Sequence, residues 1–210
     1  FFLSIQLTVI SFAFALPFGA LVAVMRTSTF APMRALGATV VEAIRNVPLL
    51  AHLLFWYFAF PELLPESLRE VLYANNPEVV CAVIALTLYA GVHMAEDIRS
   101  GIRAVPPTQL EAARSLGLGR VAAVRLVLLP QALRASVPPL LSQTVNLWKD
   151  TSVATVIGAA ELMYQAARVE TASFRSLEAF TFATLAYLTV SLVIALLAHL
   201  FQRRYPVRTT

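Results

Sequence analysis

The residues best suited to bind a ligand are polar side chains placed inside long apolar stretches. The only lysine, Lys149, lies near the middle of the apolar stretch 137–157. Its polar neighbours in the chain are Asn146, Asp150, Thr151 and Ser152. An ammonium group binds carboxylates, and amides and hydroxyls add directional hydrogen bonds. The pattern predicts a binding site for a polar solute, with one alternative: Lys149 and Asp150 form an internal ion pair that only assists packing.

His93 and Glu96 form a second polar group within an apolar stretch. Residues three apart share one face of a helix, so the two side chains point the same way. An imidazole there suits an anionic ligand, and a carboxylate suits an ammonium group. The alternatives are a plain His93–Glu96 contact, or pairing of Glu96 with Arg99 or Arg45.

Arg45 and Asn46 form a third group, with Glu42 three residues before Arg45. One interpretation places Arg45 and Asn46 at the end of a solute pathway. The other is a simple Glu42–Arg45 pair on one helix face. Pro48 follows closely and predicts a helix kink, because proline lacks the amide hydrogen of the helical ladder.

The elements that carry these groups are predicted to be membrane helices. Of 210 residues, 59% are hydrophobic and 13% are charged, against roughly 25% charged in soluble domains, and the mean hydropathy is +0.73. About 20 apolar residues span a bilayer as a helix. We therefore expect an all-α, polytopic membrane protein with five transmembrane helices, at residues 1–25, 36–60, 79–94, 137–157 and 179–201. A charge at the bilayer centre costs at least about 2.5–3.5 kcal/mol, which makes the polar groups above functional candidates.

The charges between the predicted helices alternate in sign. Segment 61–78 is acidic and segment 161–178 is mixed, whereas three other segments are basic. The segment after the first predicted helix contains Arg26 and Arg34. The segment after the third contains Arg99, Arg103, Arg114, Arg120, Arg125 and Arg134, and the C-terminal tail contains Arg203, Arg204 and Arg208. Basic loops face the cytoplasm. We expect the N-terminus outside and the C-terminus in the cytoplasm. The start at Phe1 rather than Met suggests that residues are missing before it.

Segment 99–136 is too polar to cross a membrane. Pro106 and Pro107 predict the end of the preceding helix. Thr108 and Glu111 then match a capping box that opens a short helix over 109–116. Gly117 and Gly119 end that helix, and a second one over 121–129 stops at Pro130. We expect a compact knob that docks a soluble partner, a solvated loop being the alternative.

The knob resembles a known motif. Its residues are Glu111, Ala112 and Ala113, then Gly117, and after nine residues Val127-Leu128-Leu129-Pro130. This spacing is similar to the EAA loop of ABC-importer permeases, with Val127 where isoleucine is usual. Three further segments resemble the polar amino acid subfamily: Glu42–Leu50, Ala95–Ile102 and Asn146–Ser152. Trp56-Tyr57 followed by Pro61–Pro65 is most similar to its glutamate/aspartate branch.

The resemblance implies a type I importer permease in the bacterial cytoplasmic (inner) membrane. It implies a single transmembrane domain over residues 1–210, with 99–136 as its coupling segment. The expected partners are two ATP-binding subunits, a second permease subunit and an extracytoplasmic solute-binding protein. ATP and Mg²⁺ belong to those partners, since no phosphate-loop Gly-Lys pair occurs here. In this interpretation Glu111, Ala112, Ala113, Gly117 and Pro130 serve ATPase coupling.

The expected substrate is a polar, acidic amino acid, either glutamate or aspartate. Glutamine, arginine or histidine transport by the same class of permease is an alternative, and an ion-coupled secondary transporter is another. We expect no enzyme activity, no cofactor and no metal site in this chain, because no metal-ligand cluster or nucleophile–base pattern is present. Nucleic acid is not an expected partner, and the single Cys81 excludes an intrachain disulfide.

Overall fold

The computed structural model describes residues 1–204, and this part of the chain is helical and contains no strand. The α-helices are α1 (Phe2–Thr27), α2 (Ala31–Arg45), α3 (Leu49–Leu54), α4 (Glu66–Ala74), α5 (Pro77–Arg103), α6 (Pro107–Ser115), α7 (Arg120–Ala123), α8 (Leu129–Asp150), α9 (Leu162–Ser173) and α10 (Ser176–Arg204). Two π-helical stretches, η1 (Phe55–Ala59) and η3 (Val124–Leu128), follow α3 and α7. Two 3-10 stretches, η2 (Phe60–Leu63) and η4 (Thr151–Ile157), follow η1 and α8.

Within the described residues, four helical stretches are long and apolar enough to cross a membrane: α1, α5, α10 and the continuous run 120–157. The fifth predicted crossing, 36–60, is not one straight helix. It is divided between α2 and the run 49–63, which meet at a bend of 96°. Pro48 has no amide hydrogen to continue the ladder, and the Asn46 side chain donates to the Glu42 carbonyl at the end of α2 (2.9 Å). The predicted kink at Pro48 is therefore a complete break.

Pro130 does not stop a helix, and this prediction was wrong. The helix that starts at Arg120 continues through η3 into α8, so Pro130 lies inside it. Proline removes a hydrogen bond and its ring crowds the carbonyl four residues earlier. The π-helical η3 directly before it, with its wider turn, accommodates both effects without ending the helix. The fourth crossing therefore begins well before residue 137.

The predicted capping box at Thr108 was also wrong. Helix α6 begins two residues earlier, with Pro106 as its N-cap and Pro107 as its first residue. Proline suits this place, since its φ is already helical and its missing amide hydrogen would have had no partner.

Segments 61–78 and 161–178, expected as loops, contain α4 and α9. Arg208 lies outside the described residues.

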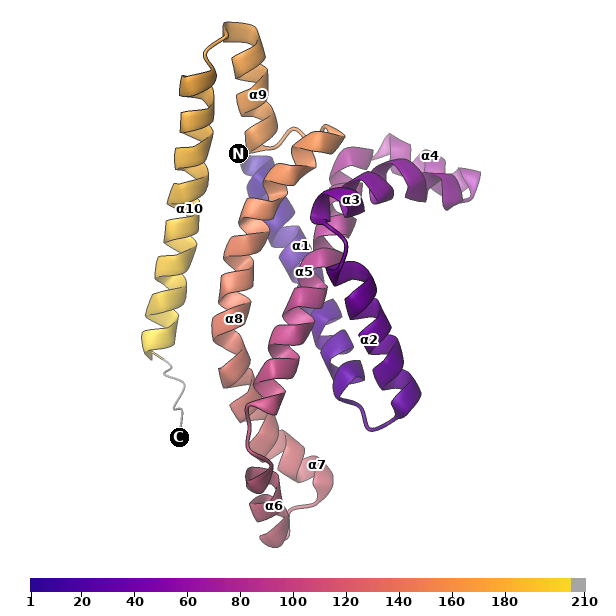
Figure 1. Ribbon diagram of the computed structural model, residues 1–210, viewed down its shortest axis with the longest axis vertical. Helices are drawn as coiled ribbons and strands as arrows, with labels where there is room; N and C mark the ends of the chain where they lie inside the picture. Colours follow the sequence, from indigo (N-terminus) through magenta and orange to yellow (C-terminus); the bar gives the residue numbers. More distant parts are fainter. Residues whose placement is uncertain (205–210) are drawn as a thin grey trace.

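The core is formed where α1, α5 and α8 pack side by side (Figure 1). Small residues let α1 and α5 approach each other closely: a Cβ on Gly19 of α1 would lie 2.6 Å from the carbonyl oxygen of Gly91 on α5. Helix α10 joins this core through Trp148, whose indole nitrogen donates to the Tyr187 carbonyl (3.1 Å). The outer faces of α10 expose leucine and phenylalanine side chains, as expected of helices in lipid.

The two ends of the bundle differ. Helices α6 and α7 project at one end, together with the α1–α2 loop and the last turn of α10, whereas α3, α4 and α9 gather at the other end (Figure 1). The arginines of the basic segments that lie within residues 1–204 therefore share one end. This arrangement separates the projecting knob from the acidic α4 by the length of the bundle.

Candidate functional site

Three of the predicted coupling residues, Glu111, Ala112 and Gly117, are exposed at the tip of the projecting knob. Glu111 and Ala112 are exposed on α6, whereas Ala113 is buried on its inner face. Gly117 has φ +87° and ends the helix, as predicted. Its amide donates to the Arg114 carbonyl, and the next amide, of Leu118, donates to the Ala113 carbonyl (3.0 and 3.1 Å). These two bonds are a Schellman motif, which fixes the turn after α6.

The tip also carries apolar side chains that the sequence pattern did not single out. Leu116 is 85% exposed and Val121 is 80% exposed, one on each side of the glycine turn. Pro130 is exposed as well, but it lies in the helix beyond the knob. Apolar side chains exposed beside Glu111 give the knob an amphipathic tip, a composition typical of protein contacts. The exposure of these side chains is visible only in the fold, because from the sequence an apolar residue in or beside a short helix is expected to be buried.

Four of the predicted pathway residues line one cavity between α5 and α8. The cavity has a volume of about 360 Å³. Its polar lining consists of His93, Asn146, Lys149 and Asp150 together with Tyr89 and Gln143. The Asn146 amide donates to the Gln143 side-chain oxygen (3.3 Å). Within the described residues, Lys149 and Asp150 form no ion pair within 4.0 Å, so the ammonium of the exposed Lys149 is not bonded to its neighbour.

Buried polar atoms without partners lie on the same face of α5. The Nε2 atom of His93 and the Oδ2 atom of Asp97 are both buried and have no hydrogen-bond partner among residues 1–204. Such atoms are costly unless something satisfies them. The Arg45 guanidinium acts electrostatically on both side chains. Of these two residues His93 lines the cavity, so the cavity wall carries one polar atom that has no partner among the described residues.

The remaining predicted pathway residues lie elsewhere. The Thr151 side chain is buried, and its hydroxyl donates to the Trp148 carbonyl (2.8 Å). The Ser152 hydroxyl donates to the Lys149 carbonyl (2.7 Å). Asn46 is exposed at the end of α2 and donates to the Glu42 carboxylate (2.9 Å), in place of the Glu42–Arg45 pair that the sequence left open. These hydroxyl and amide groups already have partners in their own helices.

Glu96 lies outside the cavity and joins α5 to α1. Arg26 on α1 donates to one of its carboxylate oxygens (2.5 Å), and Arg99 donates to both oxygens (2.6–3.1 Å). Pairing with Arg99 was one of the alternatives considered, and a contact with His93 was another. The structure has the Arg99 pair and adds Arg26, which lies 70 positions earlier in the chain.

Glu161 is a buried acid that the sequence did not mark as special. Its carboxylate is fully buried. It accepts hydrogen bonds from the hydroxyls of Thr155 (2.5 Å), Tyr187 (2.6 Å) and Ser4 (3.3 Å) and from the amide of Tyr164 (2.7 Å). One carboxylate thus joins α1, η4, α9 and α10. A possible sequence signal was its position directly before a helix, where an acid can cap the first turn.

Among the described residues, no group of three or more His, Cys, Asp or Glu side chains is arranged to hold a metal ion. The arrangement instead consists of a polar cavity inside a helical bundle and an exposed knob at one end of it. The first suits solute binding and the second suits docking of another protein.

Comparison with known proteins gives consistent similarities. Residues 15–206 match the family described as binding-protein-dependent transport system inner membrane component. The chain is 33% identical over 208 residues to the glutamate/aspartate import permease protein GltJ of Escherichia coli K12, covering 97% of this chain and 85% of that one. It is 34% identical over 204 residues to the probable glutamine ABC transporter permease protein GlnM of Bacillus subtilis 168, covering 97% and 90%. A crystal structure of an amino acid ABC transporter with histidines superposes with a TM-score of 0.85 at 31% identity, covering 97% of this chain and 91% of that one.

Proposed function

This chain belongs to the family of binding-protein-dependent transport system inner membrane components and is an amino-acid ABC importer permease; on that premise we propose that its substrate is an acidic amino acid, glutamate or aspartate. The cavity between α5 and α8 carries the proposal. It places Lys149, the only lysine, beside His93 and Asp150 in a site large enough for a small solute.

Charge favours an acidic substrate. Glutamate and aspartate carry one ammonium and two carboxylates, so a site of low dielectric must offer them more positive than negative partners. The Lys149 ammonium supplies positive charge at the cavity, and Arg45, which lies outside the lining, acts electrostatically on His93. Asp150 supplies the matching carboxylate for the α-ammonium group. The Nε2 atom of His93, which has no partner among the described residues, is placed to bond a carboxylate or an amide.

Glutamine is the second candidate. The probable glutamine permease GlnM of Bacillus subtilis is as similar to this chain as the glutamate/aspartate permease GltJ. Glutamine has the same backbone groups and an uncharged side chain of the same length as glutamate. The two candidates differ in whether Lys149 binds the side chain of the substrate.

Uptake measurements separate these candidates. The permease is reconstituted in vesicles with its ATPase and binding protein, and uptake of labelled glutamate, aspartate, glutamine and arginine is compared. We expect the acidic pair to be preferred. Lys149→Met should remove this preference, and Lys149→Arg, which retains the charge, should keep it. Preferred uptake of glutamine or arginine by the wild type would refute the acidic substrate and leave the permease family intact.

We further propose that the knob couples the chain to ATP hydrolysis by other subunits. The expected assembly contains two ATP-binding subunits, which bind ATP and Mg²⁺, a second permease subunit and an extracytoplasmic solute-binding protein. Glu111 on α6 and Leu116 at its C-cap are exposed, while the Schellman turn at Gly117 fixes the end of the helix. A short helix held in this way moves as a rigid lever when a bound ATPase closes.

Reversal of the charge on Glu111 tests the coupling. A charge-assisted hydrogen bond contributes about 1.5–3 kcal/mol, so Glu111→Lys should lower ATP-driven uptake roughly tenfold or more and should abolish stimulation of ATPase activity by substrate. Glu70→Lys is the matched control, since Glu70 is an exposed acid on α4 at the opposite end of the bundle. Equal stimulation and uptake in Glu111→Lys and the wild type would contradict this role. Uptake without ATP would instead favour an ion-coupled transporter.

We propose a bacterial cytoplasmic (inner) membrane location with the knob in the cytoplasm. The support is the basic end of the bundle, at which the α1–α2 loop, α6, α7 and the last turn of α10 gather (Figure 1). Positive loops remain on the cytoplasmic side. In this orientation the N-terminus is outside and the C-terminus is inside, and residues 1–210 form one permease domain with 99–136 as its coupling segment.

A further inference from the structure

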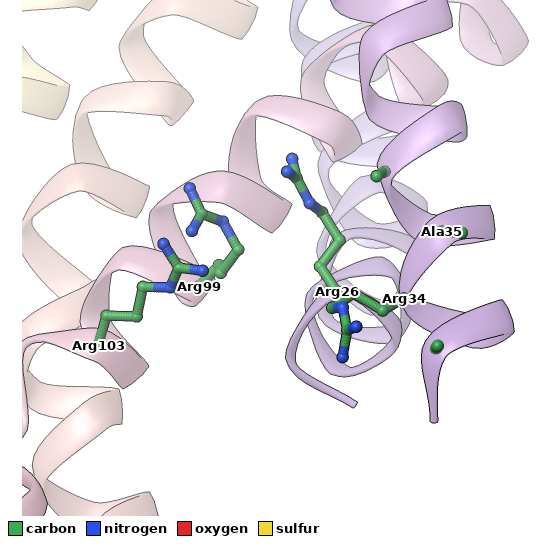
Figure 2. Close-up of a pocket in the computed structure, with 7 residues that line it drawn as sticks. Arg26, Arg34, Ala35, Arg99 and Arg103 are labelled. Carbon is green, nitrogen blue, oxygen red and sulfur yellow. The ribbon is translucent and has the colours of Figure 1, made fainter. Parts of the chain in front are cut away.

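A second cavity opens at the knob end of the bundle, away from the cavity between α5 and α8. Its volume is about 470 Å³. Four arginines from three helices line it: Arg26 of α1, Arg34 of α2, and Arg99 and Arg103 of α5. Figure 2 shows these side chains approaching the cavity from the two sides. The remaining lining residues are Ala31, Ala35 and Ala38, on one face of α2.

The cavity has an excess of positive charge. Two of the lining arginines, Arg26 and Arg99, are bonded to the carboxylate of Glu96, which is not itself a lining residue. Arg34 and Arg103 are exposed and form no ion pair with any residue of the described chain. Arg34 donates only to the Ser28 carbonyl (3.2 Å). Four guanidinium groups and one carboxylate leave a net charge of about three, and guanidinium groups bind phosphate oxygens in pairs.

The surroundings of the cavity indicate the type of anion. It lies at the ends of α1 and α5, which are long enough to cross a membrane, so it opens at the depth of lipid headgroups. The alanines of α2 form a wall with small side chains, which leaves room for an apolar portion of a ligand beside the arginines. Phe30, the N-cap of α2, and Leu36 on α2 are exposed (63% and 57%), as side chains that face acyl chains are.

We propose that this four-arginine cavity binds a phosphate group, in the form of the headgroup of an anionic phospholipid. Basic pockets between helices on the cytoplasmic side are suited to such headgroups. Arg34 and Arg103 bind the phosphate oxygens, and the alanine wall contacts the glycerol and the start of the acyl chains. Because Arg26 and Arg99 also hold Glu96, the bound lipid connects α2 to the α1–α5 contact.

The test measures ligand binding to the full chain, purified with the subunits that accompany it, in phosphatidylcholine nanodiscs or detergent. The probes are dioctanoyl phosphatidylglycerol, dioctanoyl phosphatidylcholine and inorganic phosphate, and bound molecules are counted by native mass spectrometry. We expect phosphatidylglycerol to bind in preference to phosphatidylcholine. Each arginine near a membrane surface contributes about 1 kcal/mol, so Arg34→Gln with Arg103→Gln should weaken this binding about 30-fold.

Two controls make the result specific. Arg203→Gln with Arg204→Gln removes the same charge from the end of α10, at the same end of the molecule, and should not change the binding. Ala35→Leu narrows the alanine wall and keeps every charge, so it should weaken binding of the lipid but not of inorganic phosphate. Binding of phosphate alone, in place of the lipid, would assign the site to a free anion and overturn the lipid assignment. Equal binding of the two lipids, or equal loss in both double variants, would overturn the site itself.

Discussion

Gly101 on α5 is placed where a single methyl group should measurably weaken the bundle. A Cβ at this position would overlap the Ser136 hydroxyl of α8 and would lie 2.8 Å from the Ala132 carbonyl and 3.0 Å from the Ser136 amide. Ordinary contacts begin at 3.4 Å, so the two backbones must separate by about 0.6 Å. A gap of 0.5–1 Å loses roughly a quarter to a half of the dispersion attraction of the atoms along it. We expect Gly101→Ala to lower the free energy of unfolding by about 1–3 kcal/mol.

Equilibrium unfolding in mixed micelles with increasing SDS measures this loss. Ser100→Ala is the matched control, because Ser100 is the exposed neighbour on the same helix and its substitution should change stability by less than about 0.5 kcal/mol. The double variant Gly101→Ala with Ser136→Ala removes the hydroxyl but not the two backbone atoms, so it should recover only part of the loss. Wild-type stability of Gly101→Ala, or full recovery in the double variant, would refute the argument that the α5 and α8 backbones are in contact here.

Three further predictions concern single positions. Glu161→Gln replaces an acceptor oxygen by a donor that faces hydroxyl donors, and it should lower the free energy of unfolding by about 1–3 kcal/mol; unchanged thermal melting would contradict the role of this carboxylate in joining four elements. Gly117→Val places a branched side chain at φ +87° and should cost about 1–2 kcal/mol and slow ATP-driven uptake, whereas Gly119→Ser, at φ −63° in open space, should do neither. Glu96→Gln weakens the α1–α5 link to Arg26 and Arg99 and should cost about 1–3 kcal/mol by the same SDS titration; a variant as stable as the wild type would show that this ion-paired group contributes no net stability.

The knob was predictable because its geometry is local. The end of α6 requires a residue with positive φ, and the sequence supplies glycine at position 117. The start of the same helix was placed two residues late, since Pro107 in the first turn and a capping Thr108 are both favourable local signals. The error at Pro130 was of a different kind. A proline disrupts the helical hydrogen-bond ladder, but here a π-helical turn at Val124–Leu128 precedes it and the helix continues.

For the candidate binding residues, too, partners close in the sequence could be predicted and partners far away in it could not. Arg99 was a possible partner of Glu96 from the sequence, since the two are three residues apart on one helix. Arg26, 70 positions away, could not be deduced. The carboxylate of Glu161 accepts from Ser4, 157 positions earlier, and nothing near Glu161 in the chain indicates that partner. Of the polar groups around Lys149, the cavity takes up Asn146 and Asp150 and leaves Thr151 bonded within its own helix.

The sequence alone determined that this protein consists of membrane-crossing helices with a polar knob between two of them, because the transfer of a side chain into lipid and the geometry of a turn depend on neighbouring residues in the chain. Only the tertiary structure decided which charges meet, since that depends on how α1, α5, α8 and α10 lie beside one another. It turned one predicted crossing into a bent pair and brought Arg26 to Glu96 and Ser4 to Glu161. It also placed Arg34 of α2 and Arg103 of α5 around one cavity. Electrostatic interactions act across distances of a few ångströms in space, whatever the separation along the chain.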